Sequence, residues 1–188
     1  MTKQEQRSLA LSARRAMSAA ERASASAAIC ERLLTLPQLQ RAGTVLSYIA
    51  LYDEVDLSAL HEALSVRGVR LAFPVSLSHG LMEVCEPCGW QKGPFGIREP
   101  DREHSMPVRP EEIALVLAPC VAFDEKCARL GHGAGYYDRY LPRCPRAAVI
   151  AAAFECQKLP AVICEEHDRR MDAVVTEKGI YCQNRPLK

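Results

Sequence analysis

The sequence predicts an α/β fold with an open, mostly parallel, doubly wound sheet, flanked by helices and preceded by an N-terminal helical arm. Apolar, β-branched runs such as 44–49, 113–118 and 147–153 alternate with segments of helical spacing, which is typical of parallel sheets. The first 36 residues contain no such run and are expected to be helical. At 188 residues, the chain is expected to form one domain, 1–188, with the helices of 1–36 packed on the α/β core.

The N-terminal arm is expected to contain two helices. Ser18 followed by Glu21 is a capping-box pattern, so a new helix should begin after a break near Met17 and Ser18. Pro37 is expected to close the second helix.

The remaining elements are expected at these positions: strands 44–49, 69–73, 81–85, 113–118, 147–153 and 173–176, and helices 56–67 and 136–141. Pro74 should stop the strand that precedes it. Five prolines and three glycines fall in 86–110, which is therefore predicted to be a long loop. Loops of this length in a small domain are usually functional or mobile.

Composition excludes several classes of protein. The 24 Lys and Arg residues balance 23 Asp and Glu, which argues against a nucleic-acid partner. The longest nearly apolar stretch, 113–123, contains Pro119 and is shorter than the ~20 residues that span a bilayer, so no membrane partner is expected. The nine cysteines are scattered and no apolar signal segment opens the chain, which favours a reduced, cytoplasmic protein.

Alternating glycines in 131–135 lie between an expected buried strand and an expected helix. Such glycines let backbone N–H groups turn toward a ligand, and the helix start adds further N–H donors, which suits a phosphate. Arg129 and Arg139 can add positive charge, and Asp138 offers a carboxylate for a metal ion. Taken alone, the glycines are equally typical of a flexible turn.

The segment FDEKCARLGHGAGYYDRYL, 123–141, resembles the signature of the 5-formyltetrahydrofolate cyclo-ligases, also called 5,10-methenyltetrahydrofolate synthetases. Other segments match in family order and extend the resemblance over essentially the whole chain: Lys3 and Arg7, RRAMSAAER at 14–22, DEVD at 53–56, GPFGIREP at 93–100, and HDRRMDAVVTE at 167–177. Two glycine positions of the family hold Cys120 and Cys127 here, and Ala134 replaces a glycine or lysine.

The resemblance implies an enzyme that uses ATP and Mg²⁺ to convert 5-formyltetrahydrofolate into 5,10-methenyltetrahydrofolate. In this chemistry the formyl oxygen is phosphorylated, N10 attacks the activated carbon, and ADP and phosphate are released. The partners would be small molecules only, and the chain is expected to be a monomer.

The resemblance also assigns residues. ATP would be bound by Lys3, Arg7, Arg129, Leu130, Gly131, His132, Gly133, Ala134, Gly135, Tyr136 and Tyr137, with Lys3, Arg129 and Tyr136 catalytic. The folate would be bound by Ile49, Glu54, Phe95, His132 and Tyr136, with Pro94 and Ile97 in the same apolar wall and Trp90 close by. Asp138 and Asp168 would hold Mg²⁺, with Asp172 an alternative to Asp168. A tightened loop is the expected effect of Ala134, because a Cβ disfavours positive φ.

Three alternatives remain open. Another enzyme on a similar fold, such as a sugar-phosphate isomerase or an acyl-thioester transferase, would not respond to ATP with Mg²⁺. A non-catalytic folate- or nucleotide-binding module would bind ligand without turnover. A zinc-dependent interaction domain built on Cys85 and Cys88 would need further ligands, and incidental cysteines explain this pair better.

Overall fold

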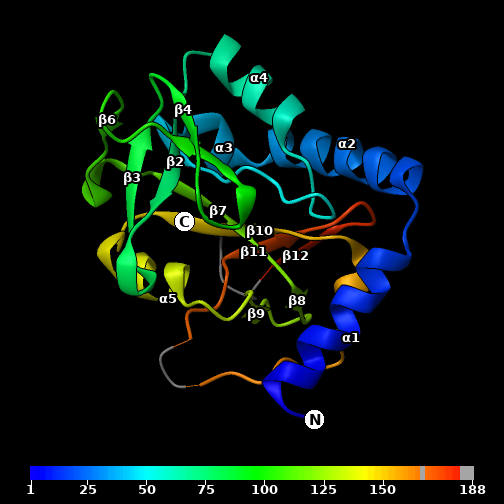
Figure 1. Cartoon of the computed structure of the whole chain (residues 1–188). Coiled ribbons are helices and arrows are strands. Elements are labelled where there is room, and N and C mark those ends of the chain that lie inside the picture. The colour runs from blue at the N-terminus through cyan, green and yellow to red at the C-terminus, as the bar shows by residue number, and fades with distance from the viewer. Residues whose placement is uncertain (166–167, 183–188) are drawn as a thin grey trace.

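A single mixed sheet organises the part of the chain that this computed structural model describes, residues 1–165 and 168–182 without the side chain of Phe95 (Figure 1). Its strands are, in spatial order, β12 (Ile180–Cys182), β11 (Ala173–Val175), β10 (Ala148–Ala152), β7 (Leu115–Pro119), β1 (Thr44–Leu46), β2 (Arg70–Ser76), β3 (Met82–Glu86) and β6 (Met106–Pro107). The five strands from β11 to β2 are mutually parallel, and the strands at both edges are antiparallel. The predicted open, mostly parallel sheet is confirmed.

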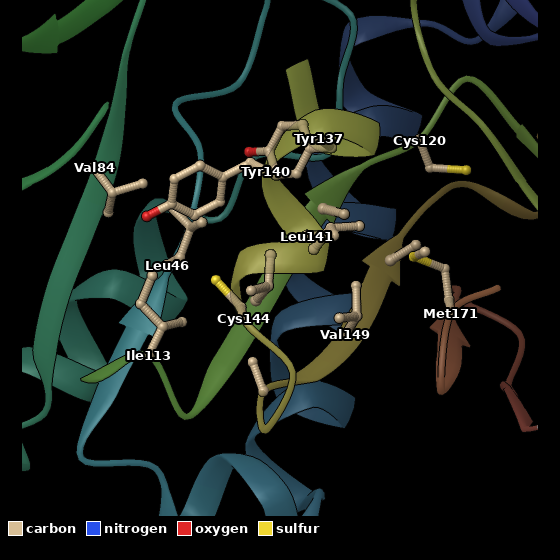
Figure 2. Close-up of a cluster of buried hydrophobic side chains, with 14 of the residues drawn as sticks. Leu46, Val84, Ile113, Cys120, Tyr137, Tyr140, Leu141, Cys144, Val149 and Met171 are labelled. Atoms are coloured by element: carbon tan, nitrogen blue, oxygen red, sulfur yellow. The ribbon is translucent and has the colours of Figure 1, made fainter. Parts of the chain in front are cut away.

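Helices cover both faces of this sheet, because successive strand residues point to opposite sides. Leu115 and Leu117 face α2 (Ala19–Thr35) and α4 (Ser58–Val66), in a core that also contains Ile29 and Leu60. Val116 and Ala118 belong to the other core, which α5 (Tyr136–Tyr140) and the 3₁₀ turn Leu141–Arg143 cover. Figure 2 shows this second core, where Tyr137, Tyr140 and Leu141 gather with Leu46 and Val149.

The N-terminal arm is the predicted pair of helices, α1 (Lys3–Ala16) and α2. Glu21 N donates to Ser18 Oγ at 3.2 Å and Ser18 N donates to Glu21 Oε2 at 2.7 Å, so the capping box that predicted the break is present. Pro37 does not simply close α2. That helix ends at Thr35, and Pro37 opens a short helix α3 (Pro37–Arg41), a first-turn position where its missing N–H costs nothing.

Pro74 does not end β2, contrary to the sequence prediction, but lies inside it opposite Val84 of β3. The carbonyl of Val84 accepts from Val108 N, on the side of β3 that faces away from β2. Pro74 and Val84 therefore exchange no backbone hydrogen bonds with each other. The position of the missing N–H of Pro74 therefore faces the β1 side, where β1 has already ended at Leu46. The proline removes no bond from the sheet.

The sequence predicts a long loop at 86–110, but this segment contains regular structure. It contains a hairpin of β4 (Trp90–Lys92) and β5 (Arg98–Pro100), and then β6. Three short elements that the sequence did not predict are β8 (Ala122–Phe123), β9 (Arg129–Leu130) and β12. In the described part of the chain, no helix has both the length and the apolar character needed to cross a membrane.

The order of the strands sets the position of the site. From β1 the chain proceeds to β2 on one side, whereas β7, β10 and β11 follow one another on the other side. In open α/β sheets such a reversal leaves a crevice at the carboxyl ends of the two strands that flank it. Here those strands are β1 and β7.

Candidate active site

A cavity of ≈ 610 Å³ opens at this reversal, lined by residues that follow β1, by Pro119 at the end of β7 and by the glycine loop 131–135. Lys3 and Arg7 of α1 close one side. The end of β2, the start of β3 and the β4–β5 hairpin contribute another wall. The cavity therefore joins segments from both ends of the chain and the middle of the sheet.

Lys3 is held by two carboxylates at the α1 side of the cavity. Its Nζ lies 2.8 Å from Asp168 Oδ2 and 2.9 Å from Glu165 Oε1. Burial lowers the pKa of Lys3, but the hydrogen bonds and charges of these two carboxylates outweigh burial and raise the pKa above its ordinary value. Lys3 is therefore a cation that lines the cavity.

Arg7 supports the glycine loop from the same helix. Its Nε donates to the carbonyl of Gly131 at 2.9 Å. Gly133 has φ +101°, and a Cβ there would lie 3.3 Å from Arg7 Cζ. Glycine at 133 is therefore favoured by its backbone conformation, and a Cβ there would also crowd the guanidinium of Arg7.

Arg129 and Asp138 form an ion pair in the next part of the wall. Arg129 Nη2 donates to Asp138 Oδ1 at 2.9 Å, and Nη1 donates to the carbonyl of Pro119 at 3.0 Å. The guanidinium also lies over the ring of Tyr137, with Cζ 5.7 Å from the ring centroid. The side chain of Arg129 extends from β9, is only 5% exposed, and is held between β7 and α5.

Glu54 occupies the loop that follows β1. Its Oε2 accepts from Leu51 N at 2.9 Å, and its Oε1 lies 2.8 Å from His132 Nε2 of the glycine loop. Behind it, Arg14 Nη1 is 3.9 Å from Oε1, and Arg14 Nη2 donates to Asp53 Oδ1 at 2.8 Å. These contacts keep a carboxylate that is 6% exposed at the cavity surface.

The structure brings most of the sequence-predicted site residues to this one cavity, but Arg139 and Pro94 do not line it, and Arg139 donates to the carbonyl of Gly80 instead. The cavity is lined by Lys3, Arg7, Ile49, Glu54, Ile97, Arg129, Leu130, Gly131, His132, Gly133, Ala134, Gly135, Tyr136, Tyr137, Asp138 and Asp168. The side chain of Phe95 and the start of the last matched segment, His167, lie outside the described residues. Trp90 does not line the cavity but packs edge-on against Phe73, which does, with centroids 5.2 Å apart.

Sequence reasoning missed part of the lining: Tyr48, Leu51, Phe73, Ser76, Met82, Arg98, Glu99, Pro119 and Glu165. Most of these come from β2, β3 and the hairpin, whose approach to the glycine loop is a tertiary effect. Arg98 and Glu99 had a local signal, because both lie inside the GPFGIREP segment.

The carboxylates suit a magnesium ion that also binds phosphate. Asp138 and Asp168 both line the cavity, whereas Asp172 does not and accepts from Val149 N at 2.7 Å. Nowhere in residues 1–165 and 168–182 do three or more His, Cys, Asp or Glu side chains gather as a metal site. Mg²⁺ commonly uses one or two carboxylates and takes its other ligands from water and phosphate, so the donor set fits.

The three departures from the family pattern lie in different settings. Cys127 adopts φ +58°, a conformation that favours the glycine expected at this position from the resemblance. Ala134 is not among the non-glycine residues with positive φ, so the expected tightening of the loop by its Cβ is wrong. Cys120 is buried, and burial raises the pKa of its thiol to about 12, which keeps it protonated.

The Cys85–Cys88 pair shows no sign of a zinc site in the described residues, which hold no cluster of three ligands. Cys85 is buried, and burial raises the pKa of its thiol, whereas Cys88 is exposed.

Comparison with known proteins identifies the family. A model of the 5-formyltetrahydrofolate cyclo-ligase family matches residues 1–177. The chain belongs to this family. It is 33% identical over 144 residues to a 5-formyltetrahydrofolate cyclo-ligase of Mycolicibacterium smegmatis, which covers 72% of this chain and 74% of the relative. It is 28% identical over 175 residues to a probable 5-formyltetrahydrofolate cyclo-ligase of Schizosaccharomyces pombe, with 84% and 86% covered.

A solved structure of a cyclo-ligase relative agrees with the fold. The 5,10-methenyltetrahydrofolate synthetase of Aquifex aeolicus superposes with a TM-score of 0.86 at 29% identity, covering 100% of this chain and 96% of that one.

Proposed function

We propose that this cyclo-ligase family member converts 5-formyltetrahydrofolate to 5,10-methenyltetrahydrofolate, with ATP as co-substrate and Mg²⁺ as cofactor. One observation carries the proposal. A single cavity joins a cationic, glycine-rich wall, suited to phosphates, to the buried acceptor Glu54, suited to the N–H donors of a pterin.

The cationic wall is proposed to bind ATP. Lys3 and Arg7 approach from α1, and Arg129 is fixed beside the loop, so three positive side chains flank backbone that contains two positive-φ glycines, Gly133 and Gly135. Phosphoryl transfer needs mainly positioning and charge stabilisation. Lys3 and Arg129 are proposed to stabilise charge on the transferred group, and Tyr136, at the first position of α5, to orient it.

Glu54 is proposed to accept N–H bonds from the aminopyrimidine ring of the folate, with Ile49 packing beside it and His132 shared between the two ligands. This arrangement places the formyl group between the pterin wall and the phosphate wall. Its oxygen then attacks the γ-phosphorus of ATP, and ADP leaves.

The second step forms the ring. N10 attacks the formyl carbon, its proton is lost, and the carbon–oxygen bond breaks. Phosphate departs as hydrogen phosphate, which accounts for the N10 proton, and the product carries one positive charge shared by N5 and N10.

Asp138 and Asp168 are the proposed magnesium ligands, because both carboxylates line the cavity next to the proposed phosphate site. In the absence of ligand they pair with Arg129 and Lys3, the same cations assigned to phosphate. A bound magnesium ion supplies positive charge that offsets the phosphate oxygens.

The test is to mix the protein with 5-formyltetrahydrofolate, ATP and Mg²⁺ and to follow the methenyl chromophore and ADP together. We expect the methenyl product and ADP to form in equal amounts, and neither of them to form without ATP. ADP without chromophore would mean a different acceptor, and no product with ligand-dependent thermal stabilisation would mean a binding module.

A further inference from the structure

Glu99 is a buried carboxylate in the cavity wall that the proposed mechanism does not use. It is 7% exposed and lines the cavity from β5, which packs against β2. Figure 1 shows this region, β2, β3 and β4, on the side of the molecule away from α1. Charged side chains are rarely buried to this extent unless they are paired with another group.

Its own chain satisfies only part of its bonding capacity. Among the described residues, Oε2 accepts from Ser76 N at 3.0 Å, and the one contact of Oε1 is long, 3.4 Å from Gln91 Nε2. A carboxylate offers about four acceptor sites, so most of the capacity of Oε1 remains available to a ligand. Burying such a group unpaired is costly, which makes a hydrogen-bonding ligand the natural complement.

Because Gly93 has no side chain, there is room beside it for the carboxylate of Glu99. A Cβ at Gly93 would lie 2.4 Å from Glu99 Cδ and 2.5 Å from Oε2. The φ of Gly93 is −84°, so its backbone would accept any residue. Glycine at 93 is therefore explained by the room that Glu99 needs, and not by a strained backbone conformation.

The surroundings restrict the ligand. Phe73, Met82 and Ile97 line the cavity in the same region and offer apolar contact to a flat ring. A carboxylate repels the phosphates of a nucleotide and the glutamate tail of a folate. What fits is a neutral ring with N–H donors, and a reduced pterin has such donors on its amino group, N3 and N8.

We propose that Glu99 is a second folate-binding carboxylate, which accepts N–H bonds from the reduced pterin at a wall separate from that of Glu54 and thereby helps to select the substrate. This inference rests on the proposed function. The amino group of adenine is the competing donor, and the experiment distinguishes the two.

The experiment compares Glu99→Gln and Glu99→Ala with the wild type in steady-state turnover, with 5-formyltetrahydrofolate and ATP varied in turn. Loss of a charge-assisted bond should raise KM for the folate about tenfold or more, with KM for ATP changed less than about twofold. Glu103→Gln is the matched control, because Glu103 is exposed on the following turn and does not line the cavity.

Gly93→Ala tests the same carboxylate without removing it. The new Cβ should displace Glu99 and raise KM for the folate, and in a Glu99→Ala background it should add no further increase. A purely structural role would lower the melting temperature and leave KM for the folate unchanged, which would overturn the proposal. A rise confined to KM for ATP would assign Glu99 to adenine and also overturn it.

Failure of the proposed function would be seen separately, because the wild type would then form no methenyl product. In that case direct titration of wild type, Glu99→Gln and Glu103→Gln with 5-formyltetrahydrofolate still decides the role of Glu99. Equal affinity in all three, or no binding to any, would refute it.

Discussion

Substituting Glu54 by Gln should raise KM for the folate without a matching rise in KM for ATP. The change keeps the size and one acceptor oxygen but removes the negative charge. Hydrogen bonds to a charged acceptor contribute about 1 to 1.5 kcal/mol more than neutral ones, so two bonds from the pterin would weaken by about 2 to 3 kcal/mol. That corresponds to a rise of roughly 30- to 150-fold in KM for 5-formyltetrahydrofolate.

The same change also weakens contacts inside the chain. Leu51 N and His132 Nε2, at 2.9 Å and 2.8 Å, would face a neutral amide, while Arg14 would retain Asp53 at 2.8 Å. A loss of about 2 kcal/mol in the free energy of unfolding is expected, which lowers the melting temperature by about 4 to 8 °C in a chain of this size.

The assay is steady-state turnover with each substrate varied at saturating levels of the other, at a temperature well below the melting transition. Glu62→Gln is the control, because it makes the same chemical change at an exposed position of α4. An unchanged KM for the folate, or an equal rise for ATP, would show that Glu54 does not contact the pterin.

Three further outcomes are expected. Asp138→Ala should abolish turnover and weaken the dependence on Mg²⁺ while the fold remains intact by circular dichroism, and unchanged activity would remove Asp138 from the metal site. Lys3→Ala should raise KM for ATP about tenfold or more with little change for the folate, because a charge-assisted phosphate contact is lost; a change confined to the folate would contradict the assignment. Burial lowers the pKa of His61 from 6.5 to about 4, so as pH falls the unfolded chain is protonated at a higher pH than the folded chain. The free energy of unfolding should therefore fall by roughly 3 kcal/mol as pH drops from about 6.5 to about 4. In denaturant titrations at several pH values His61→Gln should lose this part of the acid sensitivity, and parallel profiles for the two proteins would disprove the account.

The sequence predicted those parts of the fold that depend on local chemistry. The break between α1 and α2 follows from the reciprocal bonds of Ser18 and Glu21, which lie three residues apart and need no other partner. The inner parallel strands follow from their continuous apolar runs, because both of their faces are buried.

The errors arose where distant segments decide the structure. Pro74 can lie inside β2 only because β1 ends at Leu46, a fact that no residue near Pro74 reveals. Strands of two or three residues, such as β8 and β9, are too short for any periodicity to be visible. They depend on pairing with each other.

The candidate site shows the same division. The glycine loop and the residues of the family resemblance were predicted and are gathered in one cavity, while their individual roles stay predictions. Ser76 and Met82 were missed because they belong to ordinary strands, and only the packing of the hairpin against β2 gives them a ligand-facing position. Glu99 was overlooked although it lies inside the GPFGIREP segment, because only the packing of β5 against β2 shows that it is buried at the cavity.

The contacts of α1 have a consequence for how the protein is made. Gln6 bonds the backbone of Ala161 and Ile163, and Lys3 bonds Asp168 across 165 positions of sequence. Lys3 and Gln6 can therefore make these contacts only after residues 161–168 have been synthesised, so this side of the cavity is completed late. Nascent chains stalled shortly after α5 should hold a formed α2 but no nucleotide-binding capacity.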